Sequence, residues 1–326
     1  MDGDGLTRTL LRVEGLTVTF PTRRGPVVAV DEIAYRMGRG ETLGVVGESG
    51  CGKTVSALAL IGLADPAAMV KGRALLDGTD LLTLDAEALR RVRGRRIAMI
   101  FQEPMTALNP VYTIGDQVAE ALVVHEALSA DEARERAVAL LEQVGMPAPR
   151  RRLDDYPHQL SGGMRQRAMI AMALACKPDL LIADEPTTAL DVTVQAQILD
   201  LMLALQDEFG MAIQFISHDL GVISGVADTV AVMYAGRIVE RAPANGLFEE
   251  PLHPYTRGLL ATIPRLDARP ERLPAIAGTV PDLGALPSGC RYRNRCPLAM
   301  PRCAEQEPEL IEAAPGREVA CWAVTP

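Results

Sequence analysis

Residues 47–54 have the types and the spacing that are needed to hold a chain of phosphates. They match the pattern G-x-x-x-x-G-K-[ST] at every fixed position. The glycines let the backbone curl so that successive N–H groups face one anion, Lys53 supplies a positive charge, and the Thr54 hydroxyl can ligate Mg²⁺. The predicted phosphate-binding residues are Gly47, Glu48, Ser49, Gly50, Cys51, Gly52, Lys53 and Thr54.

Two carboxylates, Asp184 and Glu185, follow the apolar segment 180–183. If that segment is a buried strand of an open α/β sheet, both side chains emerge at its carboxyl end, where such sheets bind ligands. Asp184 is then placed to hold Mg²⁺, directly or through water, and Glu185 to accept a proton from an attacking water as a general base. A pair of solvated loop acids is the alternative, which the preceding strand and the phosphate motif disfavour.

A second anion site is indicated at Ser161, Gly162 and Gly163, which open a predicted helix. A hydroxyl cap, bare backbone N–H groups and the positive end of a helix together favour a phosphate. One triphosphate does not need two such sites in one chain, but two chains paired head to tail can each cover the γ-phosphate of the other. An ordinary helix cap is the alternative.

Alternating strands and helices must position these residues. Strands are predicted at 11–13, 16–20, 27–30, 42–46, 96–101, 180–183 and 212–217. Helices are predicted at 55–63, from a capping box of Ser129 and Glu132 to 144, from 161 to 175 and over 194–205. The alternation implies a parallel sheet with right-handed crossovers. Phe20, at the end of one predicted strand, either stacks on an adenine ring or faces the core.

Length and composition limit the classes of protein. The chain has 326 residues, of which 48% are hydrophobic, enough for one large and one smaller domain. A net charge of −9 does not favour a general nucleic-acid role. Residues 1–5 lack the apolar stretch of a signal peptide, and the longest apolar runs fall short of the roughly 18 residues that cross a bilayer. We therefore expect a cytoplasmic chain that reaches a membrane only through another subunit.

Four of the six cysteines lie in a proline-rich tail that begins near residue 241. They are Cys290, Cys296, Cys303 and Cys321. The segment has few apolar residues, so we expect a staple to hold it. A [4Fe–4S] cluster, a tetrahedral zinc, and reduced or disulfide-linked cysteines are the options, and a reducing compartment favours a metal. Cys51 is not expected to act as a nucleophile, since a small residue suits its place in the loop, although its position at a helix N-terminus could lower the pKa of its thiol and make it alkylatable.

Taken together, the motifs between residues 8 and 240 resemble those of the ATP-binding subunits of ABC transporters. The resemblance implies an α/β, P-loop ABC-type nucleotide-binding domain over 1–240, with a parallel core sheet, an antiparallel β subdomain and a helical subdomain at about 103–175. It implies ATP and Mg²⁺ as cofactors. It rests on the phosphate loop, Gln102, Leu160-Ser161-Gly162-Gly163 with Gln166, Leu181–Glu185, Ala189-Leu190-Asp191 and His218.

The resemblance also implies roles for single residues. Gln102 would sense Mg²⁺ and the γ-phosphate, His218 would hold the γ-phosphate and orient Glu185, and Asp191 would lie at the dimer contact. The Mg²⁺ ligands would be Thr54, Gln102 and Asp184, and the catalytic set Glu185, His218 and Gln102. The remaining ATP-binding residues would be Phe20, Ser161, Gly162, Gly163, Gln166 and Asp191.

A narrower resemblance, to the ATPases of dipeptide and oligopeptide importers, extends over nearly the whole chain. Residues 101–110, 156–160, 253–256 and the terminal cysteine segment carry it. It implies a subunit that energises peptide uptake at the cytoplasmic face of the cell membrane. The implied partners are a second ABC ATPase, expected to be a paralogue in a head-to-tail dimer, two transmembrane permeases and an extracytoplasmic substrate-binding protein. It also implies a small C-terminal domain over 241–326, with a [4Fe–4S] cluster on the four cysteines.

Two alternatives to peptide import remain open at this point. A soluble ABC ATPase that acts on nucleic acid or ribosomes usually has a long coiled-coil insertion or two nucleotide domains in tandem, and neither is present in this sequence. Importers of nickel chelates or glycosides use similar ATPases, and the sequence does not separate these cargoes.

Overall fold

The computed structural model describes residues 9–188, 190–263 and 275–325. They form two compact units, each of which we describe by itself. The terminal unit draws on residues 1–37, 41–83 and 215–326, and the middle unit on 38–40 and 84–214. Ala189 and residues 1–5, which carried sequence predictions, lie outside the described residues.

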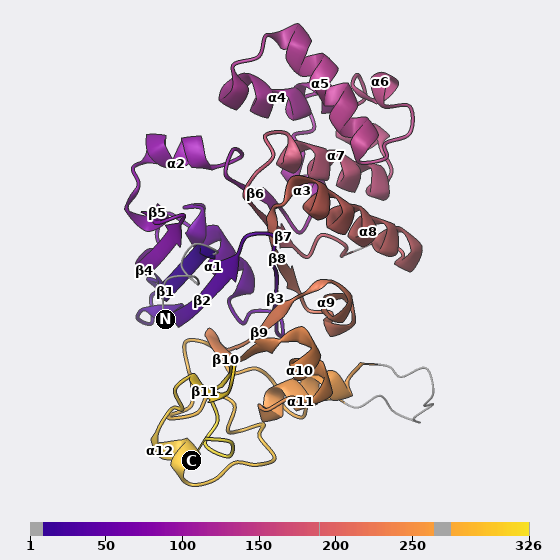
Figure 1. Ribbon diagram of the computed structural model, residues 1–326. Coiled ribbons are helices and arrows are strands. Elements are labelled where there is room, and N and C mark those ends of the chain that lie inside the picture. Colours follow the sequence, from indigo (N-terminus) through magenta and orange to yellow (C-terminus); the bar gives the residue numbers. More distant parts are fainter. Residues whose placement is uncertain (1–8, 189, 264–274, 326) are drawn as a thin grey trace, which may run out of the picture. The chain divides into compact units, whose positions relative to one another are not determined.

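An antiparallel sheet in the order β2-β1-β4-β5 begins the terminal unit (Figure 1). The sequence predicted two short strands at 11–13 and 16–20, but the structure has the single strand β1. The strand continues through Gly15, where a β-bulge adds one residue. The extra residue shifts the alternation, so that burial at Leu11 and Val13 resumes at Leu16 and Val18. The strands are β1 (Thr9–Phe20), β2 (Val27–Gly38), β4 (Met69–Leu76) and β5 (Thr79–Asp80).

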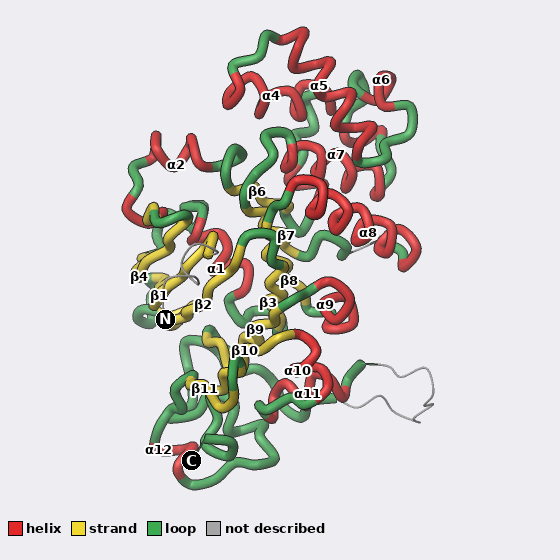
Figure 2. Tube along the Cα trace, viewed as in Figure 1, coloured by secondary structure: helices red, strands yellow, loops and turns green. Residues whose placement is uncertain are grey.

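A second set of strands in the terminal unit leads into the phosphate loop. β3 pairs in parallel with β9, and β9 pairs in antiparallel with β10. The tail adds to this sheet, because β12 pairs with both β10 and β11. The described part of the tail is otherwise mostly loop, as the sequence predicted (Figure 2). These strands are β3 (Thr42–Val46), β9 (Thr229–Tyr234), β10 (Arg237–Pro243), β11 (Ile311–Ala314) and β12 (Arg317–Val319).

The helices of the terminal unit are short. The helix after the phosphate loop begins at Lys53, two residues before the predicted start, and ends at Leu60. The others follow β5, β8 or β10, or lie in the tail. They are η1 (Leu81–Thr83), α9 (Leu220–Val226), α10 (Ala244–Glu249), α11 (Pro254–Ala261) and α12 (Arg302–Glu305), besides α1 (Lys53–Leu60).

Helices make up most of the middle unit (Figure 1). Its strands β6 (Ile97–Ile100) and β7 (Leu180–Asp184) pair in parallel, with Ile97 opposite Leu180. β8 (Ala212–Ser217) runs from this unit into the terminal unit, and every residue of β7 and β8 is buried, as expected for parallel strands. The helices are α2 (Ala86–Val92), α3 (Pro104–Ala107), α4 (Ile114–Glu126), α5 (Ala130–Gln143), α6 (Pro149–Arg152), η2 (Pro157–Gln159), α7 (Gly162–Leu174) and α8 (Val192–Phe209).

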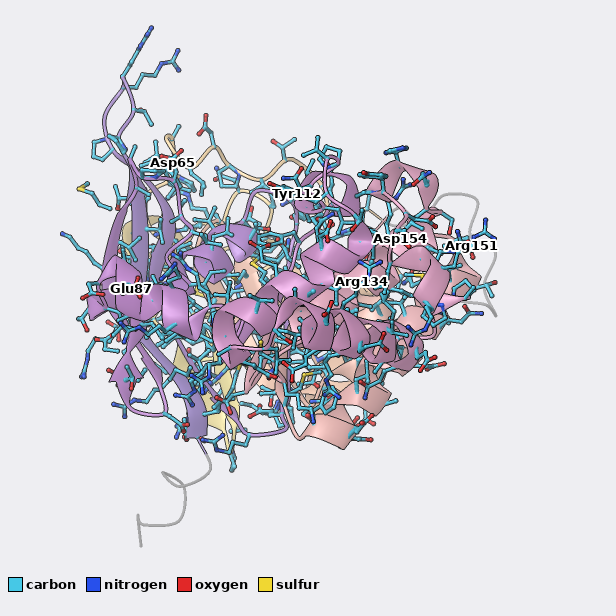
Figure 3. All side chains as sticks on the ribbon, turned by 90° about the horizontal axis from the view of Figure 1, so that it is seen from above. Asp65, Glu87, Tyr112, Arg134, Arg151 and Asp154 are labelled. Atoms are coloured by element: carbon cyan, nitrogen blue, oxygen red, sulfur yellow. The ribbon has the colours of Figure 1, made fainter. Side chains whose placement is uncertain are left out.

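Helix α5 follows its sequence pattern closely. The predicted capping box is present, because Ser129 Oγ accepts from the Glu132 N–H at 3.4 Å and the Glu132 carboxylate accepts from the Ser129 N–H at 3.0 Å. Arg134 of α5 forms an ion pair with Asp154 (Figure 3). Among the described residues no helix is long and apolar enough to cross a membrane. The predicted apolar face is at most 2% exposed at Ala133, Ala137, Leu140, Leu141 and Val144.

Candidate nucleotide site

The phosphate loop joins β3 to α1 in a backbone conformation that needs glycine. Gly47 has a φ of 153°, and a Cβ placed there would lie 2.2 Å from the Met233 carbonyl oxygen. Gly52 has a φ of 101°, and its Cβ would lie 2.5 Å from the Ala29 carbonyl oxygen. Since a real Cβ cannot approach an oxygen so closely, both positions require glycine for reasons of space as well as backbone strain.

Lys53 places its ammonium group at the loop. Its side chain is 6% exposed, and Nζ donates to the carbonyl oxygens of Gly47 at 2.7 Å and Glu48 at 3.3 Å. The positive charge is therefore held beside the backbone that curls around a phosphate chain. Thr54, the predicted Mg²⁺ ligand, follows in the first turn of α1 and is half-buried.

Cys51 is no nucleophile, as expected, but the lowering of its pKa that a helix N-terminus could bring does not occur. The thiol is 1% exposed, and burial raises its pKa although the Lys53 ammonium acts in the opposite direction. Because the thiolate loses its hydration in this place, desolvation outweighs the nearby positive charge. Cys51 therefore fills space under the loop and is a poor nucleophile.

Glu185 and Gln102 lie together in the middle unit. Gln102 Nε2 donates to Glu185 Oε2 at 2.8 Å, and Thr188 Oγ1 donates to the same oxygen at 2.9 Å. Glu185 has a φ of 46°, a left-handed conformation that is costly for a residue with a Cβ and is typical of functional positions. Asp184 precedes it at the end of β7 and is 2% exposed. The strand thus delivers two carboxylates to its end, as the sequence predicted.

Two helix N-termini of the middle unit hold the remaining predicted groups. Ser161 caps α7 by accepting from the Met164 N–H at 3.3 Å, and Asp191 caps α8 by accepting from the Val194 N–H at 3.0 Å. A Cβ on Gly163 would lie 3.1 Å from Val194, which brings the two helix starts close to each other. Ser161 and Asp191 are exposed, so both caps face solvent in the single chain.

Four predicted residues remain to be described. His218 is exposed directly after β8, and Phe20 is half-buried at the end of β1, both in the terminal unit. Gly162 begins α7, and Gln166 of the same helix is 2% exposed. The Gln166 Nε2 finds no hydrogen-bond partner among the described residues, which is uncommon for a buried donor.

The four tail cysteines are neighbours, but the structure does not support the predicted metal site. All four are free thiols, and burial, with the nearby Cys303, Cys296 and Cys321, raises the pKa of Cys290 to about 11. In the described part of the chain no group of three or more Cys, His, Asp or Glu residues is arranged to hold a metal.

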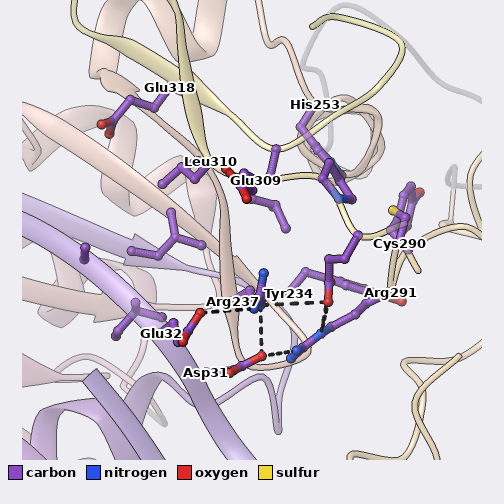
Figure 4. Close-up of a pocket in the computed structure, with 18 residues that line it drawn as sticks. Asp31, Glu32, Tyr234, Arg237, His253, Cys290, Arg291, Glu309, Leu310 and Glu318 are labelled. Carbon is purple, nitrogen blue, oxygen red and sulfur yellow. Dashed lines mark hydrogen bonds and ion pairs between the residues drawn. The ribbon is translucent and has the colours of Figure 1, made fainter. Parts of the chain in front are cut away.

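The tail has few aliphatic residues, but aromatic and charged side chains anchor it. Tyr292 packs against Tyr234 and Tyr255, with ring centroids 5.1 and 5.4 Å apart. The guanidinium of Arg291 pairs with Asp31 of β2 and, at 3.1 Å, with Glu307 (Figure 4). Aromatic packing and charge pairs therefore hold the tail to the rest of its unit.

Sequence reasoning missed two residues that contact the phosphate loop. Tyr255 Oη accepts a hydrogen bond from the Glu48 N–H at 3.0 Å. Arg295 pairs with the Glu48 carboxylate at 2.7 and 3.0 Å. Tyr255 belongs to a segment that carried the narrower resemblance, but the only sequence signal for Arg295 is its place beside Cys296.

Comparison with known families and chains agrees with this geometry. The family model described as "ABC transporter" matches residues 30–188, and that described as "Oligopeptide/dipeptide transporter, C-terminal region" matches residues 239–303. Among solved structures, the dimeric ATP-binding cassette MJ0796 bound to ADP and Pi has a TM-score of 0.65 at 27% identity, covering 72% of this chain and 99% of that one. CbiO1 from Clostridium perfringens has a TM-score of 0.63 at 28% identity, covering 74% and 92%.

Similar proteins span almost the full length of the chain. The oligopeptide transport ATP-binding protein AppD of Bacillus subtilis is 49% identical, with 96% of both chains covered. The oligopeptide protein OppD of Escherichia coli is 50% identical, covering 96% of this chain and 93% of OppD. The dipeptide protein DppD of the same organism is 49% identical, with 96% of both chains covered. The chain therefore belongs to the ATP-binding, ATP-hydrolysing subunits of the oligopeptide and dipeptide ABC importers.

Proposed function

We propose that this chain binds MgATP at its phosphate loop and hydrolyses it to energise the uptake of di- or oligopeptides through separate membrane subunits. The observation that carries the chemistry is the Glu185 carboxylate, held at 2.8 Å by Gln102 in a left-handed conformation at the end of β7. The transport names of AppD, OppD and DppD support the cargo class.

The proposed hydrolysis is an in-line displacement at the γ-phosphorus. Glu185 accepts a proton from water while the water oxygen bonds to phosphorus and the bond to the bridging oxygen of ADP breaks. Lys53 and the loop N–H groups neutralise the phosphates, and Thr54, Asp184 and Gln102 would hold Mg²⁺, which when bound offsets the charge on the phosphate oxygens. Gln102, through its contact with Glu185, orients the carboxylate.

The other proposed site residues complete the nucleotide site from two chains. His218 contacts the γ-phosphate and orients Glu185, and Phe20 stacks on the adenine. From a partner ATPase subunit, the residues equivalent to Ser161, Gly162, Gly163, Gln166 and Asp191 cover the γ-phosphate, and this chain offers the same set to its partner. The exposed caps at Ser161 and Asp191 and the dimeric state named for MJ0796 support this head-to-tail pairing.

The proposed assembly contains this chain, a paralogous ATPase, two transmembrane permeases and an extracytoplasmic substrate-binding protein. It places the chain at the cytoplasmic face of the cell membrane. We further propose that residues 1–240 form the nucleotide-binding domain and 241–326 a C-terminal domain, a division supported by the second family match, which starts at residue 239.

An iron–sulfur cluster on Cys290, Cys296, Cys303 and Cys321, or a zinc in its place, is a separate proposal. Its support is that the four free cysteines are neighbours: Cys303, Cys296 and Cys321 all act on Cys290, whose pKa is raised chiefly by burial. Protein purified without oxygen would contain iron and acid-labile sulfide, and Cys296→Ser would lose both while Cys176→Ser, at a cysteine outside the tail, would keep them. A preparation with neither iron nor zinc would refute a metal at these cysteines.

Two measurements test the main proposal. Lys53→Ala should abolish binding of a fluorescent ATP analogue, whereas Lys71→Ala, at an exposed lysine of β4, should leave it unchanged. In cells, uptake of a labelled tripeptide should depend on Lys53. Dependence of nickel-chelate or glycoside uptake on Lys53, without peptide uptake, would instead assign another cargo.

A further inference from the structure

A single residue of the phosphate loop, Glu48, is held from the C-terminal tail at both its backbone and its side chain. Its N–H donates to Tyr255 Oη at 3.0 Å. Its carboxylate accepts from Arg295 Nη1 at 2.7 Å and from Nη2 at 3.0 Å, a bidentate pair. The Arg295 side chain is 4% exposed and the Glu48 side chain 31%, so the guanidinium end of this pair is shielded from water while the carboxylate is partly solvated.

Arg295 is itself fixed by the tail and by β9. Its Nε donates to the Ala277 carbonyl oxygen at 3.0 Å, and its guanidinium lies 5.8 Å from the centroid of the Tyr234 ring. Tyr234 packs edge to face against Tyr255, with centroids 4.6 Å apart. The two groups that hold Glu48 therefore share one buried aromatic support, which leaves them little freedom to move independently.

The same tail segment also contacts strand β2 through Arg291, and β2 is linked by hydrogen bonds to Cys51 of the phosphate loop. Figure 4 shows Arg291 and Arg237 converging on Asp31. The Asp31 N–H donates to the Gly236 carbonyl oxygen at 2.9 Å, and the Gly236 N–H donates to the Cys51 carbonyl oxygen at 3.0 Å. The tail thus contacts the loop directly at Glu48 and, through Asp31 and Gly236, reaches Cys51.

The charge of Glu48 gives these contacts a consequence for nucleotide binding. A carboxylate within a phosphate-binding loop repels the phosphates that the loop must hold. The bidentate guanidinium neutralises this charge, while the Lys53 ammonium is held by the carbonyl oxygens of Gly47 and Glu48. Tyr255 in turn engages the Glu48 N–H and fixes the direction in which the loop leaves Gly47.

We propose that Arg295 and Tyr255 are positioning residues for ATP: they hold Glu48 so that its charge is neutralised and the loop is preorganised for the phosphates. The inference rests on the proposed ATP site and adds the C-terminal tail to the groups that set its affinity. It predicts an effect on nucleotide affinity and on KM, with the rate of bond cleavage unchanged.

The experiment measures the Kd of a fluorescent ATP analogue for the full chain, and KM and kcat for ATP in the assembled transporter. Arg295→Met should raise Kd and KM roughly tenfold, because the half-buried Glu48 carboxylate then faces the phosphates unpaired, and kcat should stay within about twofold. Arg293→Met is the matched control, since this neighbouring arginine of the tail donates to Ser288 and Ala304 and should leave Kd unchanged.

A double variant separates charge neutralisation from general damage to the tail. Glu48→Gln removes the carboxylate that Arg295 neutralises, so Glu48→Gln/Arg295→Met should bind nucleotide more tightly than Arg295→Met alone. If Arg295 only stabilises the fold, the second substitution brings no recovery, and that result would overturn the proposal. Equal Kd values for wild type and Arg295→Met would overturn it as well.

Two milder variants keep the test valid if Arg295→Met does not fold. Arg295→Lys retains the charge without the bidentate geometry, and Tyr255→Phe removes only the acceptor of the Glu48 N–H. Each should raise Kd about threefold with a melting temperature close to that of wild type. Unchanged Kd values in both would refute the proposal. Failure of the proposed function would give a different result: the wild-type chain itself would bind no nucleotide. If wild type binds nucleotide and the variants bind it equally well, only the role of Arg295 and Tyr255 is refuted.

Discussion

The phosphate loop and the cluster around Glu185 differ in how completely the chain itself builds them. Lys53 and Cys51 are buried, and Glu48 is held by two residues of the tail. Gln102, Ser161 and Asp191 are exposed. The first region, where we propose that the phosphates bind, is packed and hydrogen-bonded within the chain, whereas the second presents polar groups to solvent.

This difference matches a division of labour between binding and catalysis. A loop that is rigid before ATP arrives loses little entropy on binding. We therefore expect the single chain to bind ATP without a partner subunit. Exposed helix caps gain their partners only when a nucleotide and a second subunit arrive. Bond cleavage then depends on the assembly, and a lone chain is expected to bind ATP without turning it over efficiently.

The largest effect is expected for Gly47→Ala, which tests whether the loop is as tightly built as described. The new Cβ would lie 2.2 Å from the Met233 carbonyl oxygen, so the loop must shift and nucleotide binding should be lost. Gly78→Ala, in the turn between β4 and β5, is the control, since its Cβ meets nothing within 4 Å and only the cost of a φ of 80° remains, about 1 kcal/mol. Isothermal titration with ATP would measure both, and equal losses would show that the loop is not sterically limited at Gly47.

The second prediction concerns the exposed caps. Ser161→Arg should block turnover at the site built on the partner's phosphate loop while ATP still binds at Lys53 of the same chain. Crosslinking of a photoreactive nucleotide, resolved by subunit, separates the two sites. Loss of labelling on the variant chain, with normal labelling of the partner, would contradict head-to-tail pairing.

A smaller effect is expected from alkylation of Cys51, because its pKa is raised by burial. The reactive thiolate becomes abundant only as the pH rises toward that raised pKa. Inactivation by N-ethylmaleimide should therefore be slow at neutral pH, accelerate with rising pH, and be prevented by MgATP. If Cys51→Ser is inactivated as fast as wild type, another cysteine is responsible.

The smallest effect is expected at a position that only stabilises a helix. Ser129→Ala removes the cap of α5 and should lower the free energy of unfolding by about 1 kcal/mol, with no change in the KM for ATP. Chemical denaturation and steady-state kinetics test the two parts separately. A change in KM would mean that the helical region is coupled to the phosphate loop.

Local motifs were predicted well because their geometry follows from adjacent residues. The phosphate loop, the capping box of α5 and the strand ending in Asp184 all depend on short-range spacing. The ion pair between Arg295 and Glu48 could not be predicted, since the two residues lie 247 positions apart in sequence and no sequence pattern links them. The raised pKa of Cys51 could not be predicted either, because the burial that raises it depends on tertiary packing. The tail was misjudged because aromatic and charged groups, rather than aliphatic ones, anchor it.

The most direct test of the account compares Glu185→Gln with Glu208→Gln in the assembled transporter. Both glutamates accept a hydrogen bond from a glutamine at 2.8 Å, Glu185 from Gln102 and Glu208 from Gln143, but only Glu185 is placed as the general base. Glu185→Gln should bind ATP with wild-type affinity, lose nearly all turnover and retain uncleaved ATP between the two ATPase subunits, while Glu208→Gln should hydrolyse ATP normally. Turnover at the wild-type rate by Glu185→Gln would contradict the account.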